Sequence, residues 1–279
     1  MIQDESQSRR PGEQPTQQRW ALGIEYDGNA FHGYQVQANR PATVQQVVET
    51  ALSEVAGHRI RLQCAGRTDA GVHATNQVLH FDTTADRPLR AWVQGTNSLT
   101  PAAVSVRWAA PVEADFHARF RAAARRYLYV LTESPTRLAL GRDHITVVRS
   151  ALDVEAMHAA AQLLVGERDF SAFRAAGCQA RTPVRDLRLC QVRRSGALVL
   201  FDVVANAFLQ HMVRNMVGSL LQVGQRRRDS KWLAGVLASR DRRLAGPTAP
   251  AAGLYLTAVS YVRDYGFDSE YRAPWFINR

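Results

Sequence analysis

The chain has 279 residues, of which 46% are hydrophobic and 22% are charged, and these values exclude a disordered chain or a collagen-like repeat. Its length allows one large domain or two small ones. A formal charge of +10 and a pI near 10.2 favour a polyanionic partner, with nucleic acid first. Lys231 is the only lysine, however, and a GC-rich genome would produce the same arginine bias without functional meaning.

The cysteines, histidines and apolar runs argue against a disulfide-rich, metal-binding, membrane or secreted protein. The cysteines Cys64, Cys178 and Cys190 form no close pair, which predicts small buried side chains in a reducing compartment. The histidines show no metal-ligand spacing, so we expect neither a metal nor a zinc site. No apolar run approaches the length of a membrane span, and residues 1–18 lack the apolar core of a secretory signal. We therefore expect a disordered tail at 1–18 and a cytoplasmic protein.

The first half of the chain mixes strands with helices. Residues 20–26 predict a strand that ends in a turn. Thr43 and Gln46 have the spacing of a capping box, and apolar side chains recur at helical spacing up to Val55, with Gly57 placed to end the helix. Further strands are predicted at 59–64, 77–82 and 104–108, a short helix at 89–98, and a linker from residue 111.

The second half opens with an aromatic strand at 125–131, which places Tyr127, Tyr129 and Leu131 on one side. Asp153 is placed to cap a helix that runs to about residue 165. Two strands at 184–193 and 198–205 are joined by the hairpin turn Ser195-Gly196. Helices at 208–223 and 231–238, a final strand at 254–262 and an irregular tail from 263 complete the prediction.

This order of elements indicates an α+β fold, in which two α/β halves carry mostly antiparallel sheet with helices on one face. The two halves have similar element order, but no residue-level repeat accompanies it. We expect the domain division 1–18 tail, 19–115 N-terminal domain, 116–265 C-terminal domain and 266–279 irregular tail.

The least ordinary segment is Cys64-Ala-Gly-Arg-Thr-Asp-Ala-Gly-Val-His-Ala74, a glycine-containing loop between two predicted strands. Asp69 lies two residues from Arg67, so their charges can meet, and a nearby cation would hold the carboxylate ionised as a nucleophile or base. An aspartate before Ala-Gly also often only bonds the backbone of a turn. The residues alone leave both interpretations open.

A set of motifs in this order resembles the bacterial tRNA pseudouridine synthase A family. The segment G-R-T-D-A-G-V-H-A at 66–74 is similar to the signature of that family, and Y-D-G-N-A-F-H-G-Y-Q at 26–35 is similar to its N-terminal motif. The other matching segments are F-H-A-R-F at 116–120, A-R-R-Y-L-Y at 124–129, D-F-S-A-F at 169–173, R-T at 181–182, A-F-L-Q-H-M-V-R-N-M-V-G-S at 207–219 and G-L-Y-L at 253–256. Together they cover about residues 19–262.

The resemblance implies roles for individual residues. Asp69 would be the catalytic aspartate, and Arg67 would flank it and help to displace the target nucleotide. Tyr127 would stack on the target base, Arg214 would pair with Asp69 across a cleft between the two halves, and Leu254 would pack against the base.

Without the resemblance, a core position is the more typical interpretation of Tyr127 and Leu254. Arg214 lies with His211 and Gly218 on the side of the predicted helix opposite its apolar stripe. A lone arginine there is usually solvated, but this face is otherwise uncharged and Gly218 leaves room for close approach, which suits a cleft wall better.

The implied activity is the isomerisation of uridine to pseudouridine at positions 38, 39 and 40 of the anticodon stem-loop of tRNA, by a homodimer. The reaction oxidises nothing and transfers no group to or from a second substrate, so no cofactor is expected. Basic residues near the cleft would contact phosphates. These predicted contacts are Arg119, Arg125, Arg126 and Arg181. The run at 226–228 is more typical of a solvated surface.

Two other functions use the same residues differently. A non-catalytic RNA-binding protein would keep the basic surface and would not need Asp69. A hydrolase would use Asp69 as its nucleophile and release the free base, but the motif offers no second carboxylate of the kind that glycoside hydrolysis uses.

Overall fold

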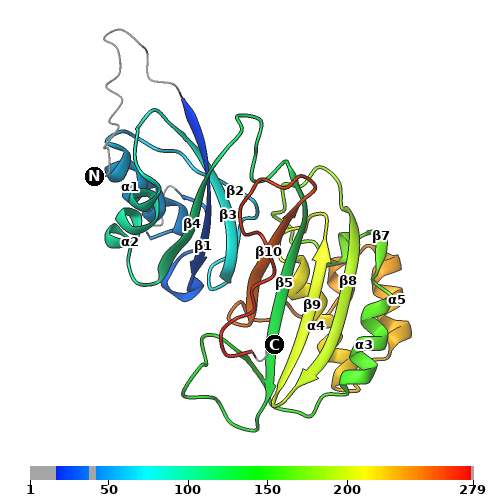
Figure 1. The fold of residues 1–279 in the computed structure, drawn as a ribbon. Coiled ribbons are helices and arrows are strands. Elements are labelled where there is room, and N and C mark those ends of the chain that lie inside the picture. Colours follow the sequence, from blue (N-terminus) through cyan, green and yellow to red (C-terminus); the bar gives the residue numbers. More distant parts are fainter. Residues whose placement is uncertain (1–16, 38–41, 278–279) are drawn as a thin grey trace, which may run out of the picture.

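One sheet of ten strands runs through the chain, and the computed structural model describes it over residues 17–37 and 42–277 (Figure 1). Its main path follows the order β4-β1-β3-β10-β5-β9-β8-β7, with β2 on β3 and β6 on β5. The strands are β1 (Gln18–Tyr26), β2 (Gln63–Cys64), β3 (His73–Thr83), β4 (Val104–Val112), β5 (Ala122–Glu133), β6 (Thr146–Val148), β7 (Gly166–Asp169), β8 (Val184–Ser195), β9 (Leu198–Ala205) and β10 (Leu254–Tyr261).

Five α-helices accompany the sheet in the described residues, so the predicted α+β class is confirmed. They are α1 (Val44–Ala56), α2 (Thr96–Leu99), α3 (Val154–Gln162), α4 (Met212–Gly224) and α5 (Ser230–Ser239), and a π-helical segment at Ala91–Gly95 precedes α2. All strand pairs are antiparallel except β3 with β10 and β5 with β6.

Helix α1 forms where the local signals place it. The Thr43 hydroxyl accepts a hydrogen bond from the amide of Gln46, and Gly57 ends the helix with a φ of 74°. Val48 and Leu52 are fully buried against the sheet. The cap at each end and the apolar stripe between them therefore act together, which is why the sequence predicts this helix so closely.

The predicted strand at 59–64 is wrong over most of its length, because only Gln63 and Cys64 pair with β3. The amide of Ile60 donates to the Ser53 hydroxyl, and the amide of Leu62 donates to the carboxylate of Glu49. Side chains of α1 thus take the backbone donors that a strand would have used.

Two other boundaries differ from the prediction. Residue 111 does not begin a linker, because Pro111 lies within β4 and pairs with Trp20. Strand β4 is the edge of the sheet, where a proline without an amide hydrogen leaves no ladder bond unmade. The predicted tail at 1–18 lies outside the described residues up to position 16, and Gln18 already belongs to β1.

Helix α4 begins at Met212 rather than at residue 208. His211, directly before it, has a left-handed backbone with a φ of 60°, which a continuing right-handed helix cannot contain. Ala175 donates its amide to the carbonyl of Gln210, and the Gln210 amide donates to the sulfur of Cys178. These contacts hold the preceding segment in a non-helical path.

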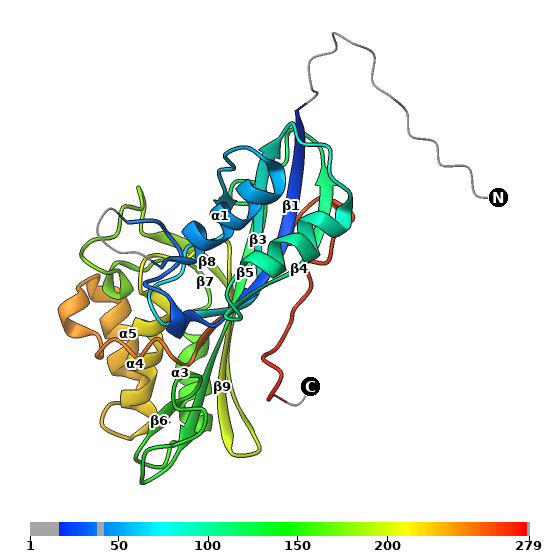
Figure 2. The ribbon, with the colours of Figure 1, turned by 90° about the vertical axis from the view of Figure 1, so that its left-hand side faces the viewer.

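The two faces of the sheet are covered differently. The helices of both halves share one hydrophobic core with the face that carries Tyr127 and Tyr129, and α3, α4 and α5 lie together on one side in Figure 2. The opposite face carries Leu128 and Val130, and the segment after β10 covers it with Ile277 and neighbouring side chains. The predicted alternation along the aromatic strand is therefore confirmed.

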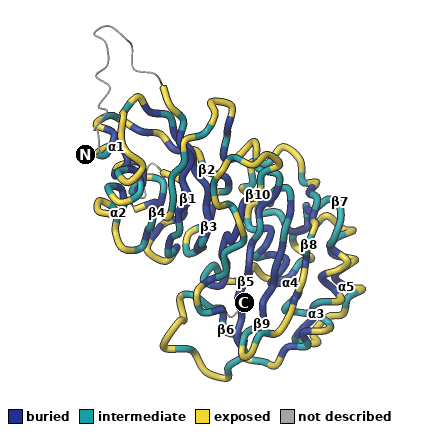
Figure 3. The backbone as a smooth tube through the Cα atoms, viewed as in Figure 1, coloured by how far each residue is buried: buried dark blue, intermediate teal, exposed yellow. Residues whose placement is uncertain are grey.

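Strand β10 joins the two halves. It pairs with β5 on one side and, in parallel, with β3 on the other, where Tyr255 is opposite His73 and Leu256 is opposite Ala74. The loop that carries Asp69 ends directly before His73. The seam between the halves therefore places this loop beside residues of the second half, and buried positions continue across it in Figure 3.

Candidate active site

Asp69 lies in the loop between β2 and β3, with its side chain 29% exposed. The preceding Thr68 is buried, and its hydroxyl is 2.8 Å from the hydroxyl of Tyr26. The carbonyl of Thr68 accepts from the amide of Tyr34, and the carbonyl of Asp69 accepts from the amide of Val72. The loop is therefore held from both sides, with the Asp69 carboxylate directed toward the second half.

Two side chains from the start of α4 meet this carboxylate. Arg214 Nη1 is 3.1 Å from Asp69 Oδ2, and His211 Nε2 is 3.3 Å from the same oxygen. The Arg214 Nε donates to the carbonyl of Ala249, whose amide donates to the carbonyl of Arg214. The cross-cleft pair that the resemblance implies is thus present, and the segment around residue 249 steadies its arginine.

His211 is the residue that sequence reasoning missed. The prediction placed it inside a helix, on the face opposite the apolar stripe, and gave it no role. Its left-handed backbone turns the ring toward Asp69 just before the first turn of α4. Helical spacing could not have identified it, because the left-handed backbone of His211 places it outside the helix that carries Arg214.

The two partners leave the carboxylate asymmetric. Both contacts are to Oδ2, and within residues 17–37 and 42–277 no hydrogen bond or ion pair reaches Oδ1. Contacts from two side chains to one oxygen fix the orientation of the carboxylate. The second oxygen is then free to act as a nucleophile or a base.

Tyr127 forms the aromatic wall of the site. It is 7% exposed, and its ring meets Phe208 edge to face at a centroid distance of 5.1 Å. Its hydroxyl lies 3.4 Å from the position that a Cβ on Gly66 would take, so the glycine lets the catalytic loop approach the ring. Burial raises the pKa of Tyr127, and the negative charge of Asp69 adds to the effect. The tyrosine is therefore a neutral, mostly buried surface near the carboxylate.

Two leucines of β10 lie on the same face. Leu254 is opposite Tyr129 in the sheet, and Leu256 is opposite Tyr127 and lies against Gly66. Both are buried. The leucine nearest the tyrosine and the catalytic loop is thus Leu256, and Leu254 lies one step further along the strand.

Arg67 does not pair with Asp69, so that expectation from the sequence is wrong. Its side chain is exposed, and no hydrogen bond or ion pair joins it to another residue in the part of the chain that the structure describes. Thr68 points into the core between them, so Arg67 and Asp69 leave the loop in different directions. Arg67 is therefore a free cation beside the site.

The predicted phosphate contacts divide into two groups. Arg125 is only 8% exposed, and its five N–H groups donate to backbone carbonyls, among them those of Ala65 and Arg119. It has no donor left for a phosphate, so we withdraw it from the predicted contacts. Arg126 pairs with Asp202, whereas Arg119 and Arg181 are exposed.

Three side chains of metal-ligating type also meet near the seam. Ligand atoms of Asp27, His73 and His144 lie within 4.8 Å of one another. His73 Nδ1 accepts from the amide of Gly28, and its Nε2 lies within hydrogen-bonding distance of the carbonyls of Asp143 and Ala252. Both ring nitrogens of His73 are therefore occupied, and burial lowers its pKa, which keeps the ring neutral. The cluster fastens the two halves together, and we assign no metal to it.

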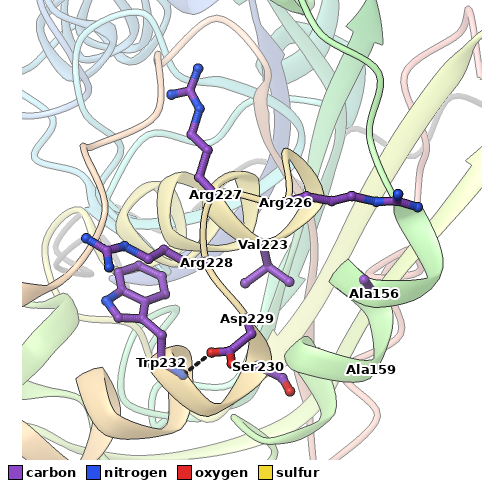
Figure 4. Close-up of a pocket in the computed structure, with 9 residues that line it drawn as sticks. All are labelled: Ala156, Ala159, Val223, Arg226, Arg227, Arg228, Asp229, Ser230 and Trp232. Carbon is purple, nitrogen blue, oxygen red and sulfur yellow. Dashed lines mark hydrogen bonds between the residues drawn. The ribbon is translucent and has the colours of Figure 1, made fainter.

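A basic hollow of about 770 Å³ lies at the far end of α4 (Figure 4). Arg228 lies over the ring of Trp232, Arg226 pairs with Asp153, and Arg227 points away from both in Figure 4. Helix α4 separates this hollow from Arg214 by roughly 15–20 Å. Its one carboxylate, Asp229, accepts from the amide of Trp232 and caps α5. The hollow therefore takes no part in the chemistry at Asp69.

Comparison with known proteins identifies related chains. A family model described as tRNA pseudouridine synthase matches residues 23–121 and 160–262. A relative from Aeromonas hydrophila subsp. hydrophila named tRNA pseudouridine synthase A is 52% identical over 259 residues, which cover 93% of this chain and 96% of the relative. Relatives of the same name from Citrobacter koseri and Escherichia coli O1:K1 / APEC are each 49% identical over 265 residues, or 95% of this chain and 98% of the relative.

Among solved structures, the archaeal box H/ACA sRNP Nop10-Cbf5 complex matches with a TM-score of 0.33 and 13% identity, covering 83% of this chain and 61% of that chain. A score at this level supports no comparison of sites. Within the described residues, no helix combines the length and the apolar character that crossing a membrane requires.

Proposed function

Because this chain belongs to the tRNA pseudouridine synthase family, we propose that it isomerises uridine to pseudouridine at positions 38, 39 and 40 of the anticodon stem-loop of tRNA. The observation that carries the proposal is the Asp69 carboxylate, held through one oxygen by Arg214 and His211 with the other oxygen free. Near-complete coverage of relatives named for this activity supports it.

The reaction needs little beyond what this site offers. The C1′–N1 bond of uridine breaks, the uracil ring turns, a bond forms between C1′ and C5, and the hydrogen on C5 leaves as a proton. An ionised carboxylate opens the sequence by attacking C6, attacking C1′ or removing a proton from C2′. Each route uses the free oxygen of Asp69, while Oδ2 accepts a hydrogen bond from Arg214 and contacts His211.

The other residues bind and orient the nucleotide. The base leaves its stack to reach Asp69, at a cost of a few kcal/mol, and stacking on Tyr127 offsets part of this cost. Leu254, together with its neighbour Leu256, closes the apolar side of the pocket. The exposed Arg67 either fills the space that the displaced nucleotide leaves or binds the phosphate beside it.

Exposed arginines around the site would make the contacts to RNA phosphates. Arg119 and Arg181 are free to reach the RNA backbone, and Arg126 shares its charge with Asp202. We further propose that the protein works as a homodimer in the cytoplasm, where its substrate is. Light scattering at micromolar concentration tests the first point, and a monomeric mass would contradict it.

Tritium release tests the activity. Transcripts of tRNA that carry [5-³H]uridine are incubated with the wild type and with Asp69→Ala, because bond formation at C5 must expel that hydrogen. We expect release by the wild type alone and similar tRNA affinity for both proteins. No release by folded, tRNA-binding wild type would favour a binding protein, and free uracil among the products would favour a hydrolase. Release by Asp69→Ala near the wild-type rate would overturn the assignment of Asp69.

A further inference from the structure

An exposed aromatic side chain stands on the turn of residues 116–121, between the two halves. Phe120 is 75% exposed, and its ring meets His117 at a centroid distance of 4.2 Å. The guanidinium of Arg119 lies 5.6 Å from the same ring. A phenylalanine this exposed gives up most of the free energy that burial of its ring would contribute.

The turn that carries Phe120 is held by hydrogen bonds on nearly every backbone group. His117 Nδ1 accepts from the amides of Arg119 and Phe120. The amide of Ala118 donates to His80 Nδ1, and its carbonyl accepts from the hydroxyl of Tyr261. These bonds stabilise the conformation of the turn, from which Phe120 projects into solvent.

The base of the turn is packed as firmly as its backbone. Phe116 is fully buried and contacts the rings of His80, Tyr261, Tyr265 and Phe267. Two phenylalanines four residues apart thus differ sharply, since Phe116 anchors the turn and Phe120 faces solvent.

The turn is joined directly to the catalytic loop. Arg125 donates to the carbonyl of Arg119 at 2.6 Å and to the carbonyl of Ala65 at 2.9 and 3.1 Å. Arg125 also lies two residues before Tyr127 on the same face of β5, a separation of about 7 Å. One buried guanidinium therefore fixes the distance between the 116–121 turn and the pocket of the target base.

Positive charge surrounds the exposed ring. Burial raises the pKa of the Cys64 thiol to about 11, and Arg67 and Arg119 both oppose this rise, so both guanidinium groups lie near Cys64. Arg121 is neutralised by Asp115 at 2.8 Å, whereas no ion pair engages Arg67 or Arg119 in the described residues. Arg67 and Arg119, which lie beside Asp69 and Phe120, therefore carry charges that no acidic side chain among the described residues compensates.

We propose that Phe120 and Arg119 form a second nucleotide subsite, in which a base next to the target stacks on the Phe120 ring and its phosphate meets Arg119. The inference rests on the proposed function, which supplies the RNA. A stacked base covers an aromatic face, and an adjacent cation binds the backbone that links it to the target. An apolar protein partner would fit less well between the two free arginines Arg67 and Arg119.

This subsite holds the strand on one side of the target while the target itself leaves the stack. Because the contact is the same before and during the chemical step, its loss weakens binding of tRNA without slowing the bound complex. Removing one stacking ring weakens binding about 5- to 100-fold. The expected signature is therefore a higher KM with an unchanged kcat.

The test compares Phe120→Ala, Phe120→Tyr and Trp275→Ala, the last a matched control because Trp275 is 94% exposed and lies on the segment that covers the opposite face. Filter binding gives the Kd for tRNA, and tritium release gives kcat and KM. Fluorescence of 2-aminopurine, placed in turn at each nucleotide within three of the target, reports the stacked base.

We expect Phe120→Ala alone to raise Kd and KM, Phe120→Tyr to restore both, and one 2-aminopurine position to lose its change on binding. Wild-type values for Phe120→Ala in an active enzyme overturn the subsite and leave the function intact. Absence of tritium release by the wild type, with a Kd that still depends on Phe120, overturns the function and leaves the subsite. A changed oligomeric mass with an unchanged Kd shows a protein contact instead and overturns the inference.

Discussion

At the scale of single residues, the site depends on the difference between the two carboxylate oxygens of Asp69, one of which is bound and one of which is free. Asp69 is bound through Oδ2 by Arg214 at 3.1 Å and by His211 at 3.3 Å, and these contacts set the direction of Oδ1. His211 is held there by a left-handed backbone, a conformation that costs about 1 kcal/mol for a residue other than glycine. The left-handed backbone brings the His211 side chain into contact with Asp69, and we infer that this contact is the reason the cost is tolerated.

We expect His211→Ala to lower kcat about 10- to 100-fold with little change in KM, since one of the two side chains that hold Oδ2 of Asp69 is lost. His211→Asn should recover part of the rate, because asparagine tolerates the left-handed backbone and keeps a donor. Single-turnover tritium release measures both variants. A His211→Ala rate equal to that of the wild type would remove His211 from the site.

At the scale of elements, close approach of two backbones positions Arg214. A Cβ on Gly218 would lie 1.6 Å from the carbonyl oxygen of Pro247. The sequence suggested that this glycine leaves room in a cleft wall, but the room is filled by the segment around residue 247. That segment supplies the carbonyl of Ala249 to which Arg214 donates.

Gly218→Ala is therefore expected to displace this segment, to destabilise the fold by a few kcal/mol and to lower activity at least tenfold. Gly235→Ala is the matched control, because Gly235 lies within α5 with nothing within 4 Å of its added Cβ. Alanine there should raise stability by up to about 1 kcal/mol and leave activity unchanged. Urea unfolding and tritium release measure both. Equal effects of the two substitutions would show that the close approach of Gly218 to Pro247 does not position Arg214.

We expect the attachment of the 116–121 turn to β3 to depend on pH, because it includes the hydrogen bond from Ala118 to His80. Burial lowers the pKa of His80 to about 4, with His117 and Arg19 lowering it further and Asp82 opposing them. The folded state thus binds this proton more weakly than the unfolded state, in which the pKa of histidine is about 6.5. Stability should fall as the pH drops from about 6.5 toward 4, by about 3 kcal/mol from this residue.

His80→Asn should flatten that dependence, because the amide oxygen still accepts from Ala118 and does not titrate. The measurement is the free energy of unfolding in urea at pH 7.5, 6 and 5 for both proteins. The lowered pKa values of His73 and His117 leave some slope in the variant. An identical slope in the two proteins would show that His80 does not contribute.

At the scale of the whole molecule, the C-terminal segment ties the halves together on the face opposite the helices. Phe267 stacks on Trp108 of the edge strand β4 at 4.7 Å and meets Phe116 and Tyr261 edge to face. The prediction of an irregular tail from 263 is confirmed in its lack of helix and strand among the described residues, but the tail is part of the packed fold.

Phe267→Ala should lower the free energy of unfolding by about 2–4 kcal/mol, because it removes a ring that contacts both halves and Phe116 of the 116–121 turn. Trp275→Ala, an exposed ring on the same segment, should change it by less than about 1 kcal/mol. Thermal unfolding of the two variants beside the wild type decides this. A small effect of Phe267→Ala would mean that the segment rests on the sheet without holding it.

Local chemistry determined much of this molecule from the sequence alone. The helix from Thr43 to Gly57 and the alternation of Tyr127 with Leu128 follow from caps and periodicity, which act between near neighbours. The motif loop around Asp69 was recognisable because a resemblance compares residues in order, without needing their positions in space. These features needed no knowledge of distant contacts.

Contacts between distant residues were decided only by the tertiary structure. Asp69 and Arg214 stand 145 positions apart, and the parallel pairing of β3 with β10 brings their segments together. The roles of His211 and Arg125 depend on a left-handed backbone and on carbonyls of four other residues, which no local pattern encodes. Such contacts form because polar groups buried at the seam must find partners within the protein, and the partners in reach are set only in the folded chain.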